Sequence, residues 1–169
     1  MRAVHRILGL AALTTTIALL AAAPAYARSD AAFMKDAAHA GAAEIEASRL
    51  ATTKAKSAEV KSFAETMVAD HTKVAEELQA LATSKNVKLP DGPSITQKTE
   101  LKLINAGDDD KFDARYAKTF GVKAHESTIK LFEEAAKNAK DADVRAWAEK
   151  TLPGLRHHLE MAQALPVAK

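Results

Sequence analysis

Apolar residues recur at alternating intervals of four and three along most of the chain. Between residues 58 and 84 this series is unbroken, except that one member is a histidine: Val60, Ala64, Met67, His71, Val74, Leu78 and Leu81. The spacing places these side chains on one side of an α-helix. No segment alternates between apolar and polar residues as a half-buried strand would. The sequence therefore predicts an all-α fold.

Residues of the type that cap helices mark the starts of four long segments with this periodicity. Ser57 precedes the second segment and Asp141 precedes the fourth, and both can accept hydrogen bonds from the free N–H groups of a first turn. We expect helices over 30–56, 58–84, 109–139 and 142–164. Only short turns join the first helix to the second and the third to the fourth, so each pair should run antiparallel.

The connection between the second and third helices, residues 85–108, is much longer than the other two. Ser94 and Gln97 have the spacing of a capping box, so a short helix should begin there. The connection is long enough to run the length of a bundle. We therefore predict a ferritin-like four-helix bundle with a long crossover between helices two and three. A simple up-down-up-down bundle is the alternative.

Two parts of the sequence resemble each other. Residues 55–65 and 139–149 are identical at six of eleven aligned positions, and three of the differences are conservative. The match covers a cap, the first helical turn and an aromatic residue together. This favours duplication of a helical hairpin, although two capped, alanine-rich helix starts could also converge by composition.

The first 27 residues have the pattern of an export signal. Arg2 and Arg6 precede an apolar stretch from Ile7 to Ala23, and Ala25-Tyr26-Ala27 is the small-x-small pattern of a cleavage site. A membrane anchor is the alternative, but the stretch is short and a cleavage site follows it. We expect a cleavable signal peptide at 1–27 and one domain over 28–169, in the periplasm or secreted. No later stretch approaches membrane length, so no membrane span is expected after cleavage.

The composition excludes several classes of function. The chain has no cysteine, which removes disulfides, thiolate metal sites and thiol catalysis. Arg2 and Arg6 are the only charged residues of the leader, so 22 basic residues face 22 acidic residues after it. That balance gives no electrostatic footprint for nucleic acid. No nucleophile–base arrangement occurs either, which argues against an enzyme.

Four polar residues occupy positions of the helical seams that are otherwise apolar. They are Glu44, His71, His125 and His158, one on each long helix. Three imidazoles and a carboxylate that meet in a bundle core could hold a single divalent transition metal, with zinc, iron and copper as the candidates. The alternative is a set of buried, hydrogen-bonded histidines that use Glu44 as acceptor and bind no metal.

The pattern differs from that of di-iron bundles, which use Glu-x-x-His on two helices. Val68, Val122 and Leu155 stand three residues before the three histidines, so no such pair exists. This argues against ferroxidase or oxygen-activating chemistry. The acidic neighbours Asp70 and Glu126 are expected to point away from the core.

Several motifs together resemble a known family. They are Gly121-Val122-Lys123-Ala124-His125-Glu126, Leu131-Phe132, Leu152 to Leu159 (LPGLRHHL), Phe112-Asp113 with Tyr116, and Phe63-Ala64 with Met67 and His71. This set resembles the exported bacterial ferritin-like family catalogued as domain of unknown function 4142, over roughly Asp30 to Leu165. The resemblance implies a periplasmic or cell-envelope bundle without an established activity. We expect a small metal-binding or stress-associated envelope protein; the alternative is a structural or interaction module with an envelope protein as partner.

The export hypothesis has a direct test in the mass of the mature protein. Expression with export in a bacterial host should yield a chain that begins at Arg28, because Ala25 and Ala27 form the cleavage motif. Intact-mass spectrometry of the periplasmic or secreted fraction measures this. A product in that fraction that retains Arg2 and Arg6 would contradict the prediction.

Overall fold

A computed structural model describes residues 28–167, and the predicted signal peptide lies outside this part of the chain. The described part is all-helical, without strands. Its elements are α1 (Asp30–Lys54), α2 (Ala58–Ser84), α3 (Ile95–Ala106), the 3₁₀ turn η1 (Asp109–Lys111), α4 (Phe112–Tyr116), the π-helical segment η2 (Ala117–Lys123), α5 (Ala124–Asn138) and α6 (Ala142–Ala164). None of these helices is both long and apolar enough to cross a membrane.

The helices begin at the capping residues that the sequence suggests. Ser57 Oγ accepts from Val60 N–H at the start of α2, and Asp141 caps α6 in the same way. Ser94 and Gln97 form the expected capping box at the start of α3. These side chains satisfy N–H groups that have no partner inside the helix. The short helix within the long connection is thus confirmed.

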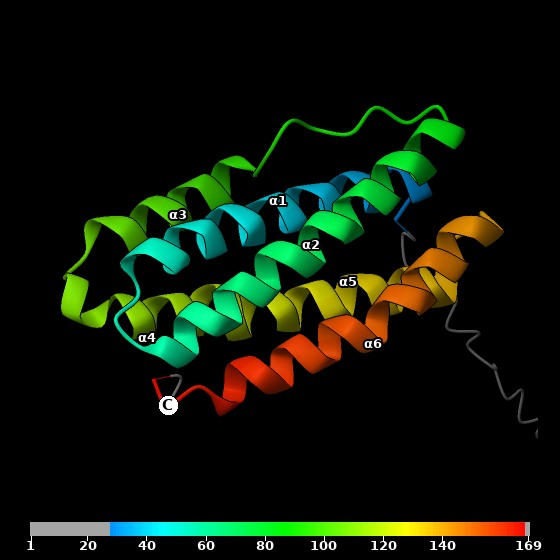
Figure 1. Ribbon diagram of the computed structural model, residues 1–169. Helices are drawn as coiled ribbons and strands as arrows, with labels where there is room; N and C mark the ends of the chain where they lie inside the picture. The colour runs from blue at the N-terminus through cyan, green and yellow to red at the C-terminus, as the bar shows by residue number, and fades with distance from the viewer. Residues whose placement is uncertain (1–27, 168–169) are drawn as a thin grey trace, which may run out of the picture.

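The long helices pack side by side around one interior (Figure 1). α1 packs on α2 and α5 packs on α6, while α1 also contacts α5 and α2 also contacts α6. The chain from residue 85 onward runs back along α1, and α3 packs against α1. As a result, α4 and α5 run in the same direction as α2 (Figure 1).

The third long segment is not the continuous α-helix that its periodicity predicts. A π-helical segment, η2, separates α4 from α5. It lies against α6, where a Cβ atom on Gly121 would come within 3.1 Å of Ala162 Cβ. Gly121 and Ala162 therefore allow a close approach of the two backbones. Wider helical turns of this kind are common near functional sites.

The core consists of two apolar clusters, one toward each end of the long helices. One cluster contains Phe63, Met67, Phe112, Tyr116, Phe120 and Ala162, and the other contains Phe33, Leu78, Ile129, Phe132, Trp147 and Leu155, among further residues. On each long helix the predicted site residue stands between members of the two clusters. On α2, for example, His71 lies between Met67 and Leu78. We call the set Glu44, His71, His125 and His158 the polar layer.

Two aspartates tie the helix pairs together. Asp113 of α4 accepts hydrogen bonds from the backbone N–H groups of Lys56, at 3.1 Å, and Ser57, at 2.7 Å, in the turn between α1 and α2. Asp30 of α1 accepts from Lys140 at 3.0 Å and Asp141 at 2.8 Å in the turn between α5 and α6. Each helix pair thus supplies an aspartate that accepts hydrogen bonds from the turn of the other helix pair.

Replacing Asp113 by alanine should destabilise the fold by about 1–3 kcal/mol, because two N–H groups lose their acceptor in a half-buried turn. Asp30→Ala is the matched control. It should cost less, since the turn at Lys140 is more exposed to water. Urea unfolding followed by circular dichroism measures both. Equal costs would contradict the proposed importance of burial at Asp113.

Candidate functional site

The four predicted residues converge inside the molecule. Their exposed fractions are 2% for Glu44, 3% for His71, 1% for His125 and 5% for His158. The centroids of the three imidazole rings form a nearly equilateral triangle with sides of 5.2, 5.4 and 5.5 Å. One nitrogen of each ring can be chosen so that all three atoms lie within 4.8 Å of one another. These are distances at which three side chains can share one small ion.

The π-helical segment orients the ring of His125. Ala124 N–H donates to Thr119 O, five residues back, before the chain returns to α-helical spacing in α5. Where the spacing changes back from five residues to four, one backbone carbonyl is left without an N–H partner inside the helix. Here it is the carbonyl of Phe120. His125 Nδ1 lies 3.0 Å from Phe120 O, which can only accept. His125 Nδ1 therefore carries a proton and donates it to this carbonyl, which directs Nε2 toward the other rings.

His71 lies between His125 and Glu44. Its Nε2 is 3.4 Å from Nε2 of His125, and its Nδ1 is 3.1 Å from Glu44 Oε2. Glu44 Oε1 is 3.9 Å from His125 Nδ1, and neither oxygen of Glu44 has a well-aligned hydrogen bond. The carboxylate thus faces the Nδ1 sides of the two rings rather than the Nε2 atoms that face each other.

His158 has a partner that the sequence analysis missed. Asp70 Oδ2 lies 2.9 Å from His158 Nε2, so the expectation that Asp70 points away from the core is wrong. Asp70 is half-exposed at the edge of α2, and its carboxylate reaches across to α6. Because the carboxylate accepts the Nε2 proton, the other ring nitrogen carries the lone pair. That atom, His158 Nδ1, is buried without a hydrogen-bond partner.

Burial sets the protonation of the layer. Desolvation lowers the pKa of His71 well below its usual value, and the neighbouring His125 and His158 lower it further. Desolvation also lowers the pKa of His158, against the opposing effect of Asp70. For Glu44, desolvation raises the pKa, while His125 and Thr128 oppose the rise. Two of the three imidazoles are therefore held neutral, the form in which histidine binds metals.

With the His71 proton on Nδ1, toward Glu44, three ring nitrogens are available: Nε2 of His71, Nε2 of His125 and Nδ1 of His158. In each ring the other nitrogen faces an oxygen acceptor, namely Glu44, Phe120 O and Asp70. Metal-binding histidines are held by such outer acceptors. The 3.4 Å between the two Nε2 atoms is close to the ~3.3 Å that two nitrogens adopt around a tetrahedral zinc ion with Zn–N bonds of ~2.0 Å.

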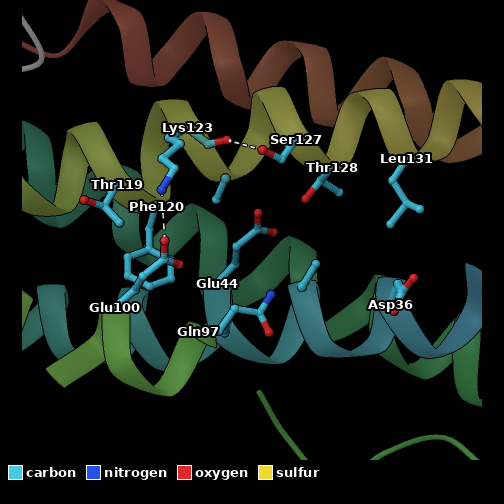
Figure 2. Close-up of a pocket in the computed structure, with 13 residues that line it drawn as sticks. Asp36, Glu44, Gln97, Glu100, Thr119, Phe120, Lys123, Ser127, Thr128 and Leu131 are labelled. Atoms are coloured by element: carbon cyan, nitrogen blue, oxygen red, sulfur yellow. Dashed lines mark hydrogen bonds and ion pairs between the residues drawn. The ribbon is translucent and has the colours of Figure 1, made fainter. Parts of the chain in front are cut away.

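A cleft of about 230 Å³ leads from the surface to Glu44. Glu44 points into this space from α1, beneath Thr128 of α5 (Figure 2). The ion pair between Lys123 and Glu100, 3.0 Å long, lies at one side of the cleft. We call it the α1–α3–α5 cleft, after the helices that line it.

Comparison with known proteins identifies a family. The model of the family described as domain of unknown function (DUF4142) matches residues 16–165. No curated protein and no solved structure matches the chain.

The lowered pKa of His71 predicts how stability depends on pH. Below about pH 6.5 the unfolded chain binds a proton at this residue that the folded chain does not bind, so stability falls as the pH decreases. His71→Gln should reduce this slope by up to about 1.4 kcal/mol per pH unit between pH 6.5 and 5. Urea unfolding with a chelator present measures the slope.

His157→Gln is the control for this measurement, because it removes an exposed imidazole that is not a member of the polar layer. A His71→Gln slope equal to that of the wild type would contradict the prediction, because it would show that His71 takes up its proton over the same pH range in the folded and unfolded states.

Proposed function

The chain belongs to the DUF4142 family, and we propose that it binds one divalent transition metal ion through His71, His125 and His158. The observation that carries the proposal is the arrangement of the ring nitrogens. One nitrogen from each of the three buried rings lies within 4.8 Å of the other two, and an oxygen atom lies beside a second nitrogen of each ring. The Nε2 atoms of His71 and His125 lie 3.4 Å apart, close enough for both to bind one ion.

Glu44 was predicted from the sequence as a fourth ligand, and this stays a prediction. The distances support a different role. Glu44 lies 3.1 Å from Nδ1 of His71, on the side of the ring away from the Nε2 atom that would bind the ion. There the carboxylate can accept the Nδ1 proton, which orients the ring and makes Nε2 a better donor. In this arrangement Glu44 also supplies a negative charge that offsets the charge of the metal.

Neutral imidazole ligands suit zinc, copper and iron alike. The absence of a Glu-x-x-His pair in the sequence supports a single-ion site rather than a di-iron centre. We further propose that the fold is a ferritin-like four-helix bundle and that the protein is exported to the periplasm or the medium. The course of residues 85–106 along α1 supports the first proposal, and the pattern of residues 1–27 supports the second.

The alternative is an interaction module with a metal-free core. In that case a protonated Glu44 donates to His71, and His71 donates to His125, so that the chain of polar groups satisfies itself. Ile95 and Leu103 of α3 are 87% and 66% exposed, which favours a contact surface on the connection. Single exposed apolar residues are common on monomers, however. They support this alternative less than the buried histidines support a metal site.

Metal analysis tests the proposal. Untagged protein equilibrated with zinc, copper(II), cobalt(II) or iron(II) and then desalted should retain one ion per chain, measured by mass spectrometry of the elements. His71→Ala, His125→Ala and His158→Ala should each abolish retention, because two imidazoles bind more weakly than three. Glu44→Gln should retain the ion with affinity lower by about 10–100-fold, as expected for an outer acceptor.

His157→Ala is the matched control, since it removes an exposed imidazole adjacent to His158. It should leave the stoichiometry at one. Wild-type protein that retains no ion, or histidine variants that retain as much as the wild type, would establish the metal-free alternative.

A further inference from the structure

A second cleft reaches the polar layer from the side opposite the α1–α3–α5 cleft. It has a volume of about 190 Å³ and lies between α2 and α6, so we call it the α2–α6 cleft. His71 and His158 line it, together with Asp70, Thr151, Gly154 and other residues. Two of the three proposed ligands thus border space that is open to solvent.

Gly154 keeps this cleft open. It precedes His158 by four residues, so the two lie on the same face of α6. A Cβ atom at this position would meet nothing within 4 Å. Packing at this position therefore does not require glycine. A larger side chain would fit there and would extend into the cleft.

Three protein ligands leave a zinc-like ion one position short of four. Metal sites in catalytic proteins keep that position for water or a small molecule, whereas structural sites close it with a fourth protein ligand. Glu44 faces the outer nitrogen of His71, and Asp70 is engaged with the outer nitrogen of His158. Neither is placed to close the site from the α2–α6 cleft.

We propose that the α2–α6 cleft delivers a small anion to the open position of the metal. This inference rests on the proposed metal site and goes beyond it, since it makes the site reactive toward external ligands. The three imidazoles bring no negative charge to the ion, and the carboxylates of Glu44 and Asp70 lie beside the outer nitrogens of the rings. An anion at the open position would be the first negatively charged ligand bound directly to the metal.

The charges along the cleft do not oppose an anion. Lys73 and Lys150 balance the carboxylates of Asp70 and Glu77, which are engaged with His158 and Lys150 at 2.9 Å each. At ~30 Å³ per water molecule the cleft holds about six, which is room for an inorganic anion or a short carboxylate but not for a nucleotide.

Azide binding to the cobalt(II)-loaded protein tests the proposal. Azide should change the visible absorption spectrum of the bound cobalt in a saturable way. Gly154→Leu should lose this response at concentrations that saturate the wild type, while it still retains one cobalt ion per chain. Lys73→Gln should weaken the response and reduce its dependence on salt.

Ser127→Leu is the matched control. It places the same side chain on an exposed helix position that lines the α1–α3–α5 cleft, and it should respond to azide as the wild type does. Circular dichroism and cobalt content show that each variant is folded and loaded.

The outcomes separate this inference from the metal site itself. If the wild type binds no cobalt, the proposed metal site fails and this inference fails with it. If cobalt binds at one per chain but azide leaves the spectrum unchanged, the site is closed and only this inference is overturned. Loss of the response in Ser127→Leu rather than in Gly154→Leu would also overturn it, by placing the access on the other face.

Discussion

The desolvation of four polar side chains in the middle of the molecule is the constraint on which the other features depend. Burying an imidazole or a carboxyl group without a partner costs several kcal/mol. The polar layer contains three imidazoles and one carboxyl group. Each ring has an oxygen from a different segment beside one of its nitrogens: Glu44 from α1, the Phe120 carbonyl from η2 and Asp70 from α2. The apolar clusters on either side hold these segments in place.

Much of this could be predicted from the sequence, because the signals are local. Caps such as Ser57 mark helix starts, and a histidine that interrupts a 4-3 series, as His71 does, must face the interior. The π-helical turn and the role of Asp70 could not be predicted in this way. A π turn adds no distinctive residue type, and Asp70 matters only because α6 packs beside α2. Both depend on how the helices are placed in space.

Duplication of a hairpin, as the sequence favours, would account for the π turn. Asp113 caps the α1–α2 turn as Asp30 caps the α5–α6 turn, and the two residues are 83 positions apart. Ala55 and Ala139, at the ends of the two odd helices, are 84 positions apart. The third segment therefore contains one residue more than α1 between equivalent points. A π turn accommodates one extra residue without breaking the helix, and η2 lies between these points.

This extra residue makes the two halves unequal where the site lies. With the offset of 84, Gly41 of α1 corresponds to His125, and Glu44 corresponds to Thr128. Thus only the first hairpin supplies the carboxylate of Glu44, and only the second supplies His125, the ring that donates to the Phe120 carbonyl.

This asymmetry makes the two faces of the polar layer different. Glu44 lines the α1–α3–α5 cleft, whereas His71 and His158 line the α2–α6 cleft. A symmetric pair of hairpins would present the same groups on both sides. The unequal pair presents a carboxylate to one cleft and two histidines to the other, an arrangement that suits the proposed metal site with one protected and one accessible side.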